Sequence, residues 1–264
     1  MKKKNTKMAY RYSILTYIFN NYERLKEIKD PQEDVEYICI TDDANLKSDT
    51  WKVVYDKNLE GLSTFDKCYK VRFSLFDYVS TDICIRIDSS IEICKSLDNL
   101  INKFNNSGYK LALMPHPRHN LVDEYNAWIS TRGYSKERAI SILNILGNIT
   151  KYDFTYKGQA ELTICIERKC KEVEDLDRMT YALLKYLGEE NKIERVDQTI
   201  YSVILNRYFN KLPVMLIFNQ LLLDSPYCKI YHHDSDETYS TKYDRTKKYS
   251  VYFFNEIKEL EFVD

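Results

Sequence analysis

The chain has 264 residues, of which 44% are hydrophobic, enough to bury the core of one sizeable domain. Its 39 basic and 40 acidic side chains give a formal net charge of −1, which excludes a general attraction to nucleic acid or to an anionic membrane. We therefore expect a single domain over residues 1–264, with a mobile charged tail over 234–264. An anionic ligand would therefore have to bind a local patch of basic side chains.

The start of the chain, MKKKNTKMAYRYSILTYIF, is basic and then apolar, but it lacks the small-residue cleavage site of a secretory signal. The longest apolar runs fall far short of the roughly 20 residues that cross a bilayer. Seven cysteines without a CxxC pair are typical of reduced thiols. These features predict a cytoplasmic protein without a transmembrane segment and leave peripheral membrane association open.

Strand-like and helix-like segments alternate along the chain. The predicted strands cover residues 10–19, 35–41, 51–55, 83–88, 109–114, 161–167 and 212–218. The predicted helices cover residues 63–80, 96–104, 121–131, 135–146, 172–187 and 195–209. This alternation predicts an α/β fold with a mostly parallel sheet flanked by helices. Ligands bind beyond the carboxyl ends of strands in such sheets, so residues just after a strand are candidate site residues.

Polar side chains occur at three of these strand ends. Thr16 and Tyr17 lie near the end of the first strand, Asp42 follows the second, and Asp88 follows the fourth in ICIRIDSSIEIC. Each alone is a weak signal, because Asp and Thr often end strands by bonding their own backbone. Their recurrence along one edge of the sheet predicts a binding site there.

Three basic residues, Lys67, Lys70 and Arg72, precede Asp88 in a predicted helix. Lys67 and Lys70 are three residues apart, so they project from the same side, within reach of a diphosphate near Asp88. A solvated basic face explains the spacing equally well.

The four histidines fall in HPRH (116–119) and in HH (232–233). The chain has no HExxH motif and no Cys/His pair at ligand spacing, so structural zinc is not expected. A hard divalent ion held by carboxylate oxygen and a histidine, with substrate phosphates completing the shell, fits better. Ser90 occupies the position where a second carboxylate would be expected. Hydrogen-bonded structural histidines are the alternative.

Further polar residues lie near predicted helix starts. Glu124 follows His116 and Arg118 closely, and Asp197 and Gln198 begin a later helix. The helix macrodipole is a sufficient structural reason for acids in a first turn. In a cleft the same groups would bind sugar hydroxyls or deprotonate an acceptor. The sequence leaves both interpretations open.

Several segments together carry a family resemblance. They are YSILTYIFNNYERL, EYICITDD, WKVV, KCYKVRFSLF, IRIDSSIEI, MPHPRHNLVDEYNAW, ELTICIERK and RVDQTIYSVIL. In this order they resemble the GT-A glycosyltransferases, in particular the glycosyltransferase-like domain family of the turgor-regulation and mucilage-related (TOD and MUCI) type, which has bacterial relatives near capsule genes. The resemblance covers roughly residues 10 to 210.

This resemblance implies a Rossmann-like GT-A fold with a mixed sheet. It implies transfer of a sugar from a nucleoside diphosphate sugar, with UDP as the expected nucleotide, to a carbohydrate acceptor such as a glycan or a lipid-linked glycan. Surface polysaccharide synthesis, for example of a capsule, is the expected setting, and Mn²⁺ or Mg²⁺ is the expected cofactor. The alternative is a non-catalytic nucleotide- or carbohydrate-binding relative of the same fold, which the loss of the second motif acid at Ser90 favours.

The resemblance also assigns roles to residues. Asp88 occupies the place of the DxD metal motif, and His232 or His233 is the counterpart of a late histidine that completes the metal shell. The expected donor-binding residues are Thr16, Tyr17, Asp42, Lys67, Lys70, Asp88 and Ser90. The residues expected to line the sugar and acceptor cleft are His116, Arg118, Glu124, Glu161, Asp197 and Gln198. Among these, Asp197, Glu124, His116 and Arg118 are the catalytic candidates, and Asp197 or Glu124 is the expected base of an inverting reaction.

Overall fold

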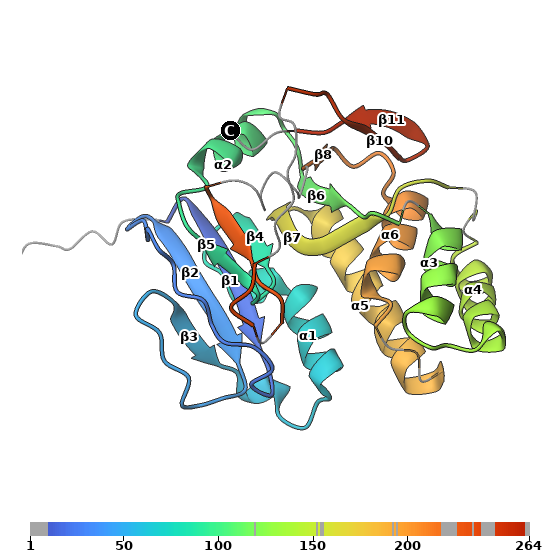
Figure 1. Ribbon diagram of the computed structural model, residues 1–264, viewed down its shortest axis with the longest axis horizontal. Coiled ribbons are helices and arrows are strands. Elements are labelled where there is room, and N and C mark those ends of the chain that lie inside the picture. The colour runs from blue at the N-terminus through green and yellow to red at the C-terminus, as the bar shows by residue number, and fades with distance from the viewer. Residues whose placement is uncertain are drawn as a thin grey trace, which may run out of the picture.

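The computed structural model describes residues 10–118, 120–151, 153, 156–191, 193, 195–217, 226–233, 235–238 and 246–261. At its centre is a seven-stranded sheet with the order β3-β2-β1-β4-β7-β6-β8 (Figure 1). Its strands are β1 (Tyr12–Ile18), β2 (Val35–Thr41), β3 (Lys52–Tyr55), β4 (Ile83–Ile87), β6 (Leu111–Pro115), β7 (Ala160–Arg168) and β8 (Val214–Leu216).

The sheet is mixed and mostly parallel, which confirms the predicted fold class. β1 pairs in parallel with β2 and β4, β2 with β3, and β6 with β8. Only β7 runs against its neighbours, since it is antiparallel to β4 and to β6. The parallel strands therefore place their carboxyl ends along one edge of the sheet.

Helices and a smaller sheet cover the two faces of the central sheet. The helices are α1 (Thr64–Arg72), α2 (Asp98–Asn106), α3 (Leu121–Ser130), α4 (Lys136–Thr150), α5 (Lys171–Asn191) and α6 (Asp197–Tyr208). Residues of α1, α3, α4, α5 and α6 share one apolar cluster with the sheet, and those of α2 share another (Figure 1). Every residue of β1, β2 and β4 is buried, as expected for strands covered on both faces. No helix of the described residues is long and apolar enough to span a membrane.

Helix α1 is shorter than the predicted segment 63–80. Ser63 caps its start by accepting a hydrogen bond from the backbone N–H of Asp66, and the helix ends at Arg72. Phe73 closes the helix, since its backbone N–H donates to the carbonyls of Tyr69 and Val71. The chain then continues through the 3₁₀ turn η2 (Leu75–Asp77).

A two-stranded antiparallel sheet returns the later part of the chain to the end of β4. β5 (Ile91–Ile93), just after Asp88, pairs with β9 (Cys228–Ile230). The backbone N–H of Tyr231 then donates to the carbonyl of Ser90 at 3.0 Å. This pairing brings the segment after β9 beside the polar break that follows β4.

Part of the predicted mobile tail is folded. β10 (Ser250–Phe253) and β11 (Glu256–Glu259) form an antiparallel hairpin. Phe253 is 0% exposed because it packs into the main apolar cluster, so apolar burial anchors this hairpin. Residues 234, 239–245 and 262–264 of the predicted tail lie outside the described residues.

A charged cluster is buried between the sheet and α5. Arg86 in β4, Glu167 in β7 and Asp177 in α5 are each at most 3% exposed. Arg86 donates to the carbonyl of Leu162 at 2.6 Å and contacts Sγ of Cys165 at 2.9 Å. Burial raises the pKa of both carboxyls, the neighbouring Glu167 raises the pKa of Asp177 further, and Arg86 opposes both shifts. The pair therefore retains a proton at higher pH than exposed carboxyls do.

Replacing Asp177 with Asn should make folding less sensitive to pH. A carboxyl whose pKa is raised in the folded state contributes stability at low pH, and this contribution is lost as pH rises through the folded pKa. We expect the wild type to lose stability as pH rises through and above the ordinary range of an exposed carboxyl, and Asp177→Asn to lose less, in urea unfolding. The control is Asp175→Asn, because Lys171 lowers the pKa of Asp175 and its titration lies below this range. Equal pH slopes in Asp177→Asn and wild type would contradict the assignment.

Candidate functional site

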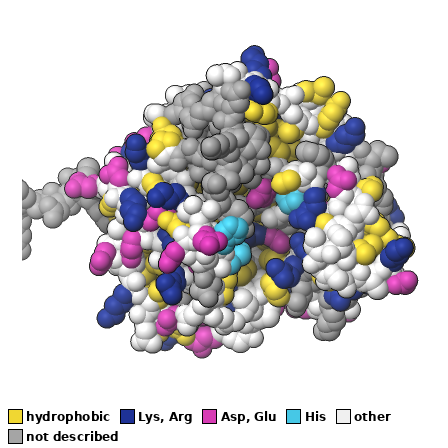
Figure 2. Space-filling model, viewed as in Figure 1, with side chains coloured by type: hydrophobic (Ala, Val, Ile, Leu, Met, Phe, Trp, Pro, Cys, Tyr) yellow, Lys and Arg dark blue, Asp and Glu magenta, His cyan; other side chains and the backbone are white. Residues whose placement is uncertain are grey.

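A cavity of about 500 Å³ lies at the carboxyl ends of β1 and β4. Its wall includes Tyr17 of β1, Asp88 after β4, one side of α1, the start of α6 and His233 after β9. On the face shown in Figure 2, histidine, acidic and basic side chains lie beside one another near the centre of the molecule. This is the edge of the sheet at which the sequence predicts ligand binding.

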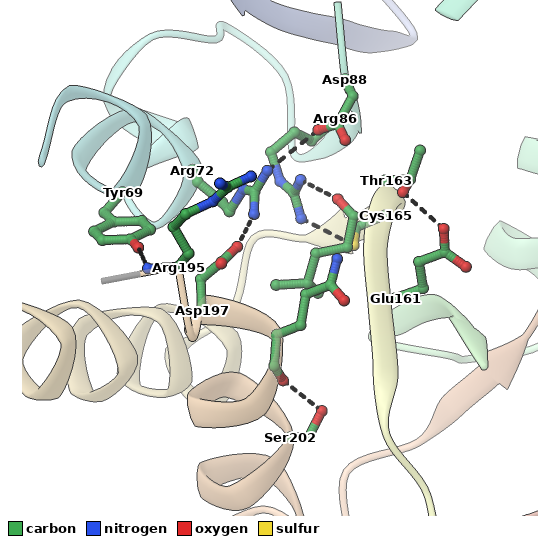
Figure 3. A network of polar contacts seen from close by, with 12 residues as sticks. Tyr69, Arg72, Arg86, Asp88, Glu161, Thr163, Cys165, Arg195, Asp197 and Ser202 are labelled. Carbon is green, nitrogen blue, oxygen red and sulfur yellow. Dashed lines mark hydrogen bonds and ion pairs between the residues drawn. The ribbon is translucent and has the colours of Figure 1, made fainter. Parts of the chain in front are cut away.

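One guanidinium joins three parts of this wall. Arg72 Nε donates to the hydroxyl of Tyr17 at 2.8 Å, Nη2 lies 3.2 Å from Asp88 Oδ1, and Nη1 binds Asp197 Oδ2. The Arg72 side chain is only 12% exposed. Figure 3 shows it between Asp88 and Asp197. Since a buried charge requires such partners, Arg72 fixes the positions of both carboxylates.

Asp88 combines partial burial with access to the cavity. Its side chain is 28% exposed, and its backbone N–H donates to the carbonyl of Thr163 at 2.9 Å. Burial raises the pKa of Asp88, and Arg72 and Arg86 counteract this by favouring the anion. The carboxylate is therefore oriented, not freely mobile at a loop tip.

The structure separates the two late histidines. His233 lines the cavity together with Asp88, and its Nδ1 lies 3.3 Å from the buried Glu23 Oε2. His232 is not part of the cavity wall, and its backbone N–H donates to the carbonyl of Glu237 at 2.9 Å. The sequence prediction named either histidine as the metal ligand. It did not distinguish them, because the β5–β9 pairing that does so is a long-range contact.

Asp88 and His233 form at most part of a metal site. Across the described ranges, no group of three or more His, Cys, Asp or Glu side chains is placed to hold a metal ion. Ser90 is 5% exposed and lies outside the cavity wall. A carboxylate and an imidazole suit a hard divalent ion only if substrate phosphates and water supply the other ligands, as is usual for Mg²⁺. They do not suit a closed structural metal site.

The two lysines of α1 do not meet at Asp88. Lys67 Nζ lies 2.7 Å from Asp42 Oδ2, and Lys70 Nζ donates to the carbonyl of Asn58 at 3.3 Å. Neither lysine lines the cavity, and Lys70 lines a separate surface hollow. The helical residues that face the cavity are spaced by three and four, and they are Thr64, Phe65, Cys68, Tyr69 and Arg72. The predicted approach of Lys67 and Lys70 to a diphosphate near Asp88 is therefore not what the structure shows.

Glu124 lines the cavity, and the two residues predicted beside it, Arg118 and His116, lie behind it, outside the cavity wall. It is 2% exposed, with Oε2 2.8 Å from Arg118 Nε and Oε1 3.7 Å from Arg132 Nη2. His116 Nδ1 accepts the backbone N–H of Arg118 at 3.0 Å. Neither His116 nor Arg118 lines the cavity, so their position fits orientation of Glu124, not contact with a ligand. His119 lies outside the described residues.

The remaining predicted residues divide between the cavity and the core. Tyr17, Asp197 and Gln198 line the cavity. Thr16 is 1% exposed and outside the cavity wall, because consecutive residues of β1 face opposite sides of the sheet. Glu161 is also outside the wall, and its Oε1 accepts the hydroxyl of Thr163 at 2.9 Å (Figure 3).

Sequence reasoning missed part of the wall. Tyr22, Arg132 and Arg195 line the cavity, but none of them follows a strand end. The aromatic residues on one face of α1 were recognised in the sequence, but packing in the hydrophobic core was a sufficient explanation for them. Arg195 begins the segment RVDQTIYSVIL that carries the resemblance, but no role was assigned to it, and no sequence pattern marked Arg132.

The chain matches no protein-family model and no curated protein sequence. Among solved structures it is similar to mouse xyloside xylosyltransferase 1 in its apo form, at 8% identity and a TM-score of 0.41, over 79% of this chain and 86% of that one. It is also similar to the glycosyltransferase GlyE of Streptococcus pneumoniae TIGR4, at 13% identity and a TM-score of 0.42, over 82% of this chain. The match covers 48% of the GlyE chain, so this chain spans about half its length. Function is therefore inferred from the residues of the cavity.

Replacing Arg72 with Met should destabilise the protein by roughly 2 to 4 kcal/mol, because Asp88 and Asp197 would be left partly buried without their cation. The control is Lys70→Met, whose Nζ donates to the carbonyl of Asn58 at 3.3 Å and forms no ion pair within the described residues, so this change should alter stability by at most about 0.5 kcal/mol. Urea unfolding at neutral pH measures both. Similar losses in the two variants would show that the Arg72 guanidinium does not hold the wall together.

Proposed function

We propose that this protein is a GT-A-type glycosyltransferase that moves a sugar from a nucleoside diphosphate sugar, a UDP-sugar in particular, to a glycan or lipid-linked acceptor. The observation that carries this proposal is the meeting of Asp88, Asp197 and His233 in one cavity at the ligand-binding edge of the sheet. A cytoplasmic role in surface polysaccharide synthesis is part of the proposal.

The reaction breaks the bond between the anomeric carbon and the diphosphate, so negative charge grows on the leaving group. Positive groups placed in advance stabilise that charge. A divalent ion held by Asp88 and His233 would, when bound, supply positive charge beside the diphosphate. Arg72 orients Asp88 in this arrangement through the 3.2 Å contact between Nη2 and Oδ1.

Groups for the sugar and the acceptor come from α6 and α3. Asp197 and Gln198 line the cavity at the start of α6, and Glu124 lines it from α3. Both carboxylates have arginine partners, which holds them in fixed orientations for hydrogen bonds to sugar hydroxyls. Asp197 is the proposed base if the reaction inverts the anomeric carbon, since it is less buried than Glu124, with 16% of its side chain exposed against 3%.

A non-catalytic binding relative is the second candidate function. The observation that favours it is that Arg72 pairs with Asp88 and Asp197 at once, so both acids are occupied in the unliganded cavity. Such a protein would bind nucleotide sugars without turning them over.

Wild-type protein should release nucleoside diphosphate from one member of a nucleotide-sugar panel in the presence of Mn²⁺. Asp88→Asn should reduce this rate on the order of 100-fold or more, because it removes the carboxylate that would hold the divalent ion beside the diphosphate. Asp82→Asn is the matched control, since Asp82 is exposed at the opposite end of β4. Saturable binding of a nucleotide sugar without turnover by the wild type would favour the binding relative instead.

Mn²⁺ binding should distinguish the adjacent histidines. In the presence of UDP, His233→Asn should weaken Mn²⁺ affinity at least about tenfold, whereas His232→Asn should leave it unchanged, because only His233 lines the cavity. Electron paramagnetic resonance of free Mn²⁺ measures the affinity without requiring activity. Equal affinities in the two variants would remove His233 from the proposed metal shell.

A further inference from the structure

The wall formed by the start of α6 contains positive charge that the carboxylates of the cavity do not neutralise. Arg72 takes up Asp88 and Asp197, and Arg118 is the closest cation to Glu124. Arg195 is exposed, lines the cavity and forms no ion pair with a carboxylate of the described residues. Figure 3 shows its side chain extending from the segment before α6 on the same side as Asp197.

The backbone of Arg195 is held in a conformation that non-glycine residues seldom adopt. Its φ of 59° lies in the left-handed region. The hydroxyl of Tyr69 accepts its N–H at 2.8 Å, and Arg132 Nη1 donates to its carbonyl. Strain of this kind persists where surrounding contacts impose it, and it is concentrated at functional sites. Both residues that impose it here line the cavity.

The start of α6 also has backbone amides without a side-chain cap and one buried hydroxyl without a partner among the described residues. Val196 precedes the 12-residue helix and gives no side-chain cap to its first-turn amides. Thr199 lines the cavity and is 1% exposed, yet its hydroxyl has no hydrogen-bond partner in the described part of the chain. An unpaired buried hydroxyl is costly, so an oxygen of a ligand in the cavity would lower this cost by pairing with it.

We propose that Arg195, Thr199 and the first-turn amides of α6, flanked by Arg132, form a subsite for a phosphate oxyanion. Helix N-termini attract anions, and a guanidinium matches phosphate geometry with two parallel hydrogen bonds. Asp197 shares this helix start, but Arg72 neutralises its charge. Its residues come from the segment after α3, the segment before α6 and the first turn of α6, whereas Asp88 and His233 follow β4 and β9.

Under the proposed function, which this step extends, the phosphate belongs to the diphosphate of the donor. Free inorganic phosphate has the same chemistry. A donor diphosphate held by α6 would have part of its charge neutralised by protein groups, so it would bind measurably without a divalent ion.

Calorimetric titration of pyrophosphate in the presence of a metal chelator, at constant ionic strength, tests the subsite. Arg195→Gln should weaken binding roughly tenfold, because a charge-assisted contact is lost. Thr199→Val should weaken binding less and should keep or raise the melting temperature without ligand, since it removes the unpaired hydroxyl. Arg207→Gln, at the exposed far end of α6, is the matched control and should bind as the wild type does.

Titrations of UDP, uridine and inorganic phosphate identify the source of the oxyanion. If Arg195→Gln weakens UDP but not uridine, the donor diphosphate occupies the subsite; if it weakens only inorganic phosphate, the free anion does. Wild-type affinity of Arg195→Gln for all of these, or no binding of pyrophosphate and phosphate by the wild type, would overturn the subsite and leave the transferase proposal standing. Arg195-dependent pyrophosphate binding without turnover of any nucleotide sugar would support the subsite and overturn the transferase proposal.

Discussion

The cavity depends on one buried cation. Arg72 ends α1 and contacts a hydroxyl of β1, a carboxylate after β4 and a carboxylate at the start of α6. Two carboxylates this close would repel each other without a cation between them, and burial strengthens the repulsion. The same contacts that stabilise the edge of the sheet therefore keep Asp88 and Asp197 in fixed positions.

The end of α1 places this cation where it is needed. The helix stops at Arg72, where Tyr69 and Phe73 pack into one apolar cluster and Val71 and Leu75 pack into another. A cation in the last turn is also favourable for the helix macrodipole. Packing of these neighbours on two sides thus holds the backbone of Arg72 in place.

Segments far apart in the chain supply different groups to the cavity. The β5–β9 pairing brings His233 to Asp88, while the start of α6 brings Arg195 and Thr199 to the same space. Under the proposed function, a metal ion held by the first pair and the protein donors of the second would both neutralise charge on the donor diphosphate. Ser90 lies outside the cavity wall.

The sequence by itself determined the strands and helices of the central fold, because their periodicities are local and strong. It also determined that Asp88 would lie at the ligand-binding edge, because that edge follows from strand direction. Tertiary structure alone decided that β7 is antiparallel, that Lys67 binds Asp42, that His233 and not His232 lines the cavity, and that Arg195 adopts a left-handed backbone. Each of these depends on contacts between segments distant in the chain, which no local spacing encodes.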